Sequence, residues 1–182
     1  MSALATPQTT TATWNIDPAH SVAEFKVKHM MISNVKGQFA KVSGVLTLDE
    51  SDLTKSRVEA LIEAASLETR DAQRDTHLKS ADFFDVAKYP TMTFISKSVA
   101  KAAGGYAVTG DLTMHGVTKE VVLHMDPPAQ EQSMGPQTRR GFDATTTIHR
   151  QDFGLNWNGT LKSGDAMLGD DVKVTLDIEA IR

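Results

Sequence analysis

The chain has no cysteine among its 182 residues, which excludes disulfide scaffolds, Cys-ligated zinc, iron–sulfur clusters and thiol catalysis. It also lacks an excess of positive charge, because 19 Lys and Arg stand against 23 Asp and Glu for a net charge of -4. The electrostatic footprint of a nucleic-acid binder is therefore missing. No run approaches the roughly 20 apolar residues of a membrane span, so we expect no integral membrane segment. What the chain does have is 40% hydrophobic residues, enough for one domain with a sizeable core.

The first 13 residues are small and polar, and they lack the basic start and apolar stretch of a secretory signal. We predict a flexible leader at residues 1–13 and a single domain at 14–182, because no biased linker or repeat divides the rest. As written, the leader predicts a cytoplasmic protein. A processed mature form that had lost a signal peptide would instead be periplasmic.

Alternation of apolar and polar residues with period two dominates the rest of the chain, and this pattern is typical of half-buried antiparallel strands. It is clearest at residues 172–180 and recurs at 23–28, 57–64 and 142–149. About eight such strands, with one helical excursion at about residues 69–86, predict an all-β fold. The expected architecture is a single eight-stranded antiparallel barrel closed on itself, which leaves no exposed edges. A barrel of this size either packs its interior with side chains or holds one slender ligand.

Two connections between strands are also predicted. Residues 106–125 are expected to form a hairpin in which Gly116-Val117 is a two-residue turn and Gly116 takes a positive φ. With His115 opposite Thr118, the apolar sets of both strands fall on one face. Residues 126–136, rich in Pro, Gln and Gly, are predicted to be a mobile surface loop between two strands.

Local signals predict one irregular strand and one helix. Gly44 interrupts a strand expected at 38–48, and a bulge there would return the apolar residues on either side to one face. Residues 71–79 have helix-compatible spacing, with Asp71 or Thr69 as the N-cap.

A series of short motifs, in a fixed order along the domain, carries a family resemblance. In order, they are Trp14-Asn-Ile-Asp17, His20-Ser21, Phe25, His29, Ser33-Asn-Val-Lys-Gly-Gln-Phe39, Asp75-Thr-His-Leu78, Phe83-Phe-Asp-Val86, Tyr89-Pro-Thr-Met-Thr-Phe94, Gly110-Asp-Leu-Thr-Met-His-Gly116-Val-Thr118 and Arg150-Gln-Asp-Phe-Gly-Leu155. Together they resemble the YceI family, whose members are lipocalin-like polyisoprenoid-binding proteins. Matches in this order over most of the chain are more specific than any single short motif.

The resemblance implies an elongated lipocalin-like barrel that holds a long isoprenoid chain, such as the tail of a polyprenyl quinone, in its lumen. It implies a carrier in isoprenoid quinone metabolism, transport or storage, with the lipid as bound ligand and no other cofactor. Members of the family can pair, which makes a homodimer a hypothesis.

Ligand contacts are expected from the inward apolar side chains and from a few polar groups. The apolar candidates are Phe25, Val27, Phe39, Leu46, Ile62, Leu78, Phe83, Phe84, Met92, Phe94, Leu112, Val121, Leu123, Phe142, Ile148, Phe153 and Trp157. The polar candidates are His20, His77 and Arg150. The alternative is a dry packed core, since every such barrel must bury its inward face.

Neither a catalytic nor a metal site is predicted. The six histidines lack metal-ligand spacing, and His20 and His77 either contact a ligand head group or make structural hydrogen bonds. Ser21 beside His20 lacks the sequence context of a hydrolase nucleophile, and Arg150 is expected to pair with Asp152 as a structural clamp. Two alternatives to carriage stay open: an enzyme acting on an isoprenoid or fatty-acyl lipid, and a stress-related protein with a filled barrel.

Overall fold

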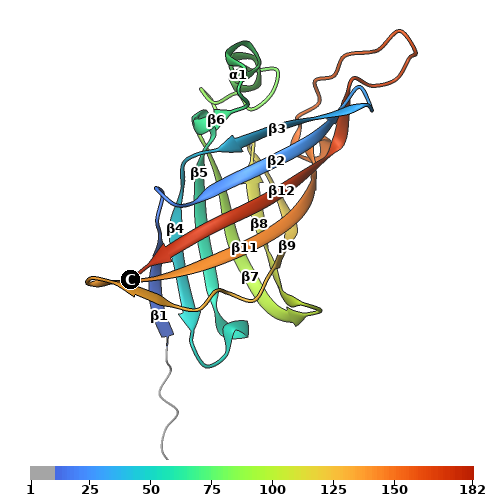
Figure 1. The fold of residues 1–182 in the computed structure, drawn as a ribbon. Helices are drawn as coiled ribbons and strands as arrows, with labels where there is room; N and C mark the ends of the chain where they lie inside the picture. Colours follow the sequence, from blue (N-terminus) through green and yellow to red (C-terminus); the bar gives the residue numbers. More distant parts are fainter. Residues whose placement is uncertain (1–10) are drawn as a thin grey trace, which may run out of the picture.

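The computed structural model describes residues 11–182, and strands dominate this part of the chain (Figure 1). The strands are β1 (Thr11–Ile16), β2 (Val22–His29), β3 (Ser33–Phe39), β4 (Val42–Asp49), β5 (Arg57–Glu63), β6 (Leu67–Glu68), β7 (Thr91–Ala102), β8 (Gly105–Met114), β9 (Val117–Met125), β10 (Gln132–Met134), β11 (Gln137–His149) and β12 (Leu168–Ile181). The helices are α1 (Ala72–Lys79) and the short 3-10 helices η1 (Leu53–Lys55), η2 (Ala64–Ser66) and η3 (Arg150–Phe153). No helix within residues 11–182 has the length and apolar character to cross a membrane.

Eight antiparallel strands close into a barrel, as predicted. The ring runs β11–β9–β8–β7–β5–β4–β1–β12, and the pairing of β12 with β11 closes it. β1 and β2 both pair with the same edge of β12, β1 near the end of β12 and β2 along the rest of it. β2, β3 and β6 therefore extend this wall beyond the ring (Figure 1). The predicted alternation favours closure, because it gives each strand one apolar face that is buried when the barrel closes.

The inward faces meet in one main core cluster centred on residues such as Trp14, Leu67 and Ala180, which are at most 1% exposed. Residues 1–10 of the predicted leader lie outside the described residues. Its last three residues are not leader but the start of β1, where Thr11 pairs with Asp49. The domain therefore begins earlier than residue 14.

The helix prediction is confirmed. α1 begins after Asp71, whose carboxylate accepts hydrogen bonds from the backbone N–H groups of Gln73 and Arg74 at 3.1 and 3.0 Å. These bonds satisfy two of the donors that a helix N-terminus leaves unpaired. α1 and the turns after it lie over the end of the barrel at which β6 stands (Figure 1).

The β8–β9 hairpin forms, but its predicted turn is displaced by one residue. The two-residue loop is His115-Gly116, with φ of 52° and 74°, and Met114 pairs with Val117. Both loop residues thus take the left-handed conformation that such hairpin loops favour. The register differs by two residues from the prediction, so that Leu112 pairs with Lys119. Because the side-chain period is two, the predicted faces survive the error.

The predicted bulge at Gly44 is wrong. The β4–β5 ladder runs through the pair Gly44–Ala60 without a register shift. The irregularity that brings Phe39 and Leu46 to the same face lies instead at Ala40-Lys41, between the end of β3 and the start of β4. Gly44 is required for another reason: a Cβ there would lie 2.2 Å from the carbonyl oxygen of Glu59, and its φ is 150°.

The predicted loop at residues 126–136 is only partly a loop. It contains β10, which pairs with β11 through Ser133–Thr138 and turns at Gly135 with a φ of 64°. β9 and β11 are therefore joined through a short additional hairpin.

Candidate functional site: an apolar cavity inside the barrel

A cavity of about 230 Å³ occupies the interior of the barrel. Nearly every predicted apolar candidate lines it. These are Phe25, Val27, Phe39, Leu46, Ile62, Leu78, Phe83, Phe84, Met92, Phe94, Leu112, Val121, Leu123, Phe142 and Ile148. The wall is almost wholly hydrocarbon, so water inside would find few hydrogen-bond partners.

Four predicted candidates lie elsewhere. Phe153 is 2% exposed but belongs to η3, outside the cavity wall. Trp157 and His77 stack edge-on, with ring centroids 4.8 Å apart, and both rings also pack on Phe83. His20 lies at an exposed turn. Their positions have a common explanation: the place of a motif along the chain does not reveal which side of a wall a side chain faces. As ligand contacts these four residues stay predictions.

Sequence reasoning also missed part of the lining. Val172, Val174, Leu176 and Ile178 of β12 line the cavity, and the alternation at 172–180 was sufficient to identify them. Leu155 and Leu168 line it as well. No local pattern marks these two, because they border an irregular segment placed by its tertiary contacts.

Arg150 is the one charged side chain that is both fully buried and part of the cavity wall within residues 11–182. It is 3% exposed, and its Nε donates to the carbonyl oxygen of Gly169 at 2.9 Å. Its Nη1 donates to the carbonyl oxygens of Leu155 and, at 2.9 Å, Trp157. The predicted clamp with Asp152 is therefore wrong, since backbone carbonyls hold the guanidinium.

The second terminal nitrogen of Arg150, Nη2, is buried without a hydrogen-bond partner among the described residues. Burial lowers the pKa of the guanidinium, and the negative charge of Asp170 acts in the opposite direction. Arginine stays protonated even so, which leaves a buried cation with unused donors at the cavity wall. Such a group can receive a carbonyl, phosphate or carboxylate oxygen.

His77 makes a structural contact. Its Nε2 lies 2.9 Å from a carboxylate oxygen of Asp82, which bridges α1 to the following turn. With Phe83 and Trp157 it forms an aromatic cluster at the helix-covered end of the barrel. The cluster holds Phe83, a cavity-lining residue, in place.

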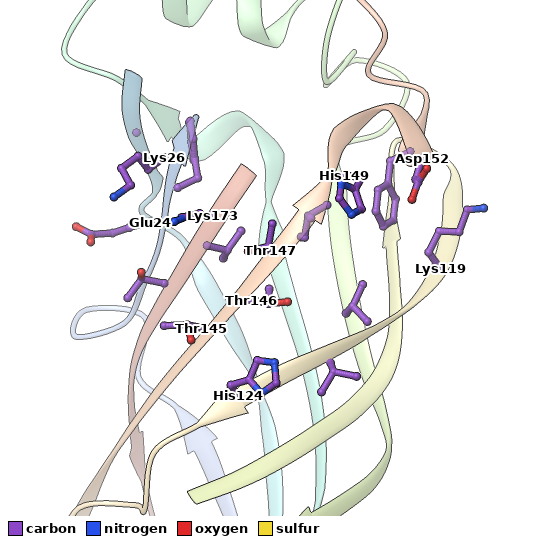
Figure 2. Close-up of a pocket in the computed structure, with 18 of the residues that line it drawn as sticks. Glu24, Lys26, Lys119, His124, Thr145, Thr146, Thr147, His149, Asp152 and Lys173 are labelled. Atoms are coloured by element: carbon purple, nitrogen blue, oxygen red, sulfur yellow. The ribbon is translucent and has the colours of Figure 1, made fainter. Parts of the chain in front are cut away.

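An outer groove of about 810 Å³ crosses the barrel wall where β9 and β11 part (Figure 2). The two strands pair only through Ala144–Met125 and Thr145–His124. Beyond that point the groove and the cavity share lining residues, including Val121, Thr146 and Ile148. The cavity thus borders the outer surface where β9 and β11 part. Lys119 and His149 lie at the rim of the outer groove (Figure 2).

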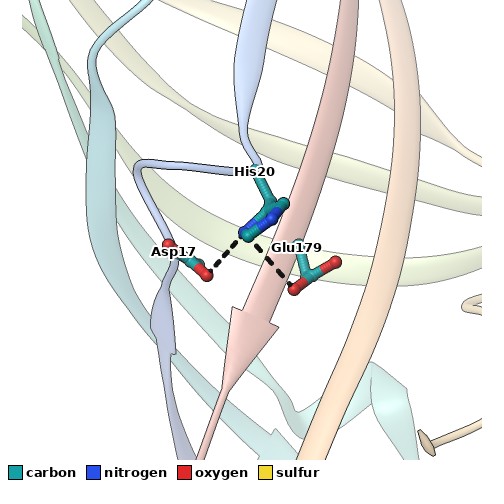
Figure 3. Close-up of side chains that lie close together, drawn as sticks. All are labelled: Asp17, His20 and Glu179. Atoms are coloured by element: carbon teal, nitrogen blue, oxygen red, sulfur yellow. Dashed lines mark hydrogen bonds and ion pairs between the residues drawn. The ribbon is translucent and has the colours of Figure 1, made fainter.

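His20 belongs to an ion-pair network away from the cavity (Figure 3). Its Nδ1 lies 2.9 Å from Asp17 and 3.8 Å from Glu179, and the guanidinium of Arg139 contacts both carboxylates. Asp17, His20 and Glu179 are close enough to share a metal ion, but Arg139 already supplies their counter-charge. Ser21 does not complete a hydrolase triad, because its hydroxyl bonds the backbone of Glu179 at 3.2 and 3.0 Å.

Hydrogen bonds from His20 and from the backbone N–H of Ala19 hold the pKa of Asp17 below its usual value. A depressed carboxylate pKa stabilises the folded protein above the unfolded-state value of about 3.9, and this contribution is lost as the pH falls through the folded value. We expect Asp17→Asn to flatten the dependence of unfolding free energy on pH between about 5 and 2. Urea unfolding at several pH values measures it. Asp126→Asn, on an exposed segment, is the control; an equal slope in wild type and Asp17→Asn contradicts the prediction.

The fold and this interior define a class, the lipocalin-like antiparallel barrels that enclose an apolar cavity. Within this class the chain belongs to the YceI family, since the YceI-like domain matches residues 14–180. A UPF0312 protein of Staphylococcus aureus strain MSSA476 is 36% identical over 167 residues, covering 91% of this chain and 95% of the relative. A UPF0312 protein of Staphylococcus epidermidis has the same identity and coverage.

Solved structures agree with this assignment. The crystal structure of a Campylobacter jejuni YceI protein matches with a TM-score of 0.70 at 32% identity, over 86% of this chain and 90% of that one. Burkholderia cenocepacia BcnA matches with a TM-score of 0.74 at 26% identity, over 90% and 98%. A polyisoprenoid binding domain from Saccharophagus degradans, implicated in plant cell wall breakdown, has a TM-score of 0.64 over 92% and 97%. At 15% identity it shows a shared fold.

Proposed function

We propose that this protein binds a long-chain isoprenoid or another amphipathic lipid, such as a polyprenyl quinone, with the tail inside the barrel, and that it acts as a carrier and not as an enzyme. One observation carries the proposal: an apolar cavity whose wall, within residues 11–182, contains a single fully buried cation with unused donors. The tail would occupy the cavity, and the polar head would accept a hydrogen bond from Arg150.

The dimensions and energetics favour a long apolar chain. β12 has 14 residues, which at about 3.3 Å per residue and a tilt near 40° span roughly 35 Å of barrel height. Each buried methylene contributes about 0.8 kcal/mol, so affinity grows with tail length without specific polar contacts. A cavity of about 230 Å³ is far larger than the roughly 10–15 Å³ that one water needs, yet it offers water few partners.

The name of the Saccharophagus degradans domain supports the same ligand class by analogy of fold. Carriage is favoured over catalysis because the buried charge at the cavity wall is bonded to backbone carbonyls, and the described cavity lining includes no Ser, Cys, His or Lys. Cytoplasmic location and pairing into a homodimer stay predictions, to be checked by cell fractionation and sedimentation.

Solvent extraction of purified protein followed by mass spectrometry tests the proposal. We expect a polyprenyl compound to be recovered, and stripped protein to take up added ubiquinone-10 and retain it through gel filtration. Lipid-free preparations that also fail to take up ubiquinone-10 would overturn the proposal in favour of a filled barrel. Chemical conversion of the added lipid would favour the enzyme instead.

A further inference from the structure

The tip of the β2–β3 hairpin exposes three consecutive apolar side chains. Met30, Met31 and Ile32 are 38%, 66% and 81% exposed. The hairpin extends one wall of the barrel, and its tip lies beside the loop that leads into β12 (Figure 1). Single exposed apolar residues are ordinary, but three consecutive exposed apolar residues at the tip of a hairpin indicate a contact surface.

The backbone of this tip is also unusual. Met30 and Met31 have φ values of 52° and 59°, the left-handed conformation that glycine and asparagine tolerate best. The strand pair His29–Ser33 and a bond from the N–H of Met30 to the carbonyl of Met167 hold them there. Glycine would relieve the strain, so methionine side chains at these positions favour a role beyond forming the turn.

A row of lysines crosses the outer face of the same wall. Lys173 of β12 pairs directly with Lys26 of β2, which pairs directly with Lys36 of β3. Like charges directly opposite each other destabilise a sheet. Among the ion pairs of lysines within residues 11–182, none involves these three. Lys28, also exposed, lies two residues nearer the tip.

The acidic groups around these lysines form no ion pair with them among the described residues. The three lysines of the row border the outer groove, where Lys119 adds a further positive charge and the acidic lining residues are Glu24, Glu120 and Asp152. Nearer the tip, Asp170 and Asp171 lie 3.8 and 2.6 Å from His149. Glu120 is already paired with Lys97 at 3.1 Å. The wall therefore combines an apolar tip with a cationic row, and this combination is complementary to a bilayer with anionic head groups.

The tip stands at one end of the cavity. His29, which precedes it, pairs with the cavity-lining Leu168, and the next residue, Gly169, accepts the hydrogen bond from Nε of Arg150. Contact of the tip with a membrane thus brings the Arg150 region of the cavity close to the lipid surface.

We propose that the β2–β3 hairpin is a peripheral membrane-docking element for anionic bilayers. Met31 and Ile32 enter the boundary between head groups and acyl chains, and Lys26, Lys36 and Lys173 contact the head-group phosphates. The proposal concerns the outer surface and holds for any cargo, so its test uses no cargo. Its failure and the failure of lipid carriage are therefore separate results.

Flotation with vesicles tests the docking surface. At 0.1 M NaCl we expect the wild-type protein to float with vesicles of 70% phosphatidylcholine and 30% phosphatidylglycerol far more than with pure phosphatidylcholine. The variant Met31→Ser/Ile32→Ser should lose at least about tenfold in binding, because two anchoring side chains leave the apolar boundary. Ile95→Ser is the matched control, since Ile95 is 44% exposed on β7.

The lysine row has its own matched control. Each lysine near an anionic surface strengthens binding about fivefold, so Lys26→Gln/Lys36→Gln should bind about 25-fold more weakly. Lys55→Gln/Lys101→Gln removes two exposed lysines from η1 and β7 and should stay within about twofold. Ile32→Trp should keep docking and shift its fluorescence to the blue when vesicles are added.

Three results would overturn the proposal: wild-type protein that does not float with the anionic vesicles, a tip variant that floats as well as wild type, or equal losses in the matched controls. A dimer that dissociates in the tip variant, without vesicle binding by wild type, would assign the tip to a second copy of the chain. Thermal unfolding of each variant verifies that the fold is intact.

Discussion

Replacing Arg150 with methionine is expected to lower the free energy of unfolding by about 3–5 kcal/mol. Burying a charge is costly, so removal of a buried ion pair is sometimes harmless. Arg150 differs because its partners are the backbone carbonyls of Gly169, Leu155 and Trp157, which stay in place when the guanidinium is gone. Their lost hydrogen bonds outweigh the relief of desolvation.

Chemical denaturation measures this effect. Arg57→Met is the control, because its side chain is 59% exposed and its pair with Glu59 lies in solvent, so a change within about 0.5 kcal/mol is expected. Arg150→Lys retains the charge but not the fork of donors and should fall between wild type and Arg150→Met. A loss below about 1 kcal/mol in Arg150→Met would contradict the structural role.

Filling the cavity is expected to abolish lipid uptake. Ala60 lines the cavity and pairs with Phe94, so Ala60→Phe places a ring in the space proposed for the tail. We expect at least a 100-fold loss of ubiquinone-10 binding, which corresponds to about 2.7 kcal/mol or roughly three to four displaced methylenes.

The stability of the same variant separates an open cavity from a packed core. In an open cavity the added ring gains contacts, and the free energy of unfolding stays equal or rises. In a packed core, overpacking costs about 1–3 kcal/mol. Ile95→Phe on the outer wall is the control for the added ring. Undiminished ubiquinone-10 binding by Ala60→Phe would place the ligand elsewhere.

The sequence predicted the fold class well because strand periodicity is a local property. At the β8–β9 hairpin the predicted register was wrong by two residues, yet Leu112 and Val121 still face the cavity, since an even shift preserves the face. At Gly44 the local rule failed. Glycine in a strand was interpreted as a bulge, whereas its cause is the close approach of Glu59 from β5, a contact between residues distant in sequence.

The candidate site divides in the same way. Alternation identified the inward apolar residues of regular strands. The same pattern was sufficient to identify Val172, Val174, Leu176 and Ile178 as lining residues. Trp157 and Phe153 were misplaced because both belong to the irregular segment around η3, where no period assigns a face.

The sequence by itself excluded thiol chemistry, predicted a closed antiparallel barrel and indicated that much of its 40% hydrophobic content forms one inward face. These are consequences of composition and short-range periodicity. Only the tertiary structure decided that Arg150 is a buried cation held by three carbonyls, that β9 and β11 part above Thr145, and that three lysines stand in one row across β12, β2 and β3. Each depends on strand register and on contacts between distant segments, which periodicity along one strand does not specify.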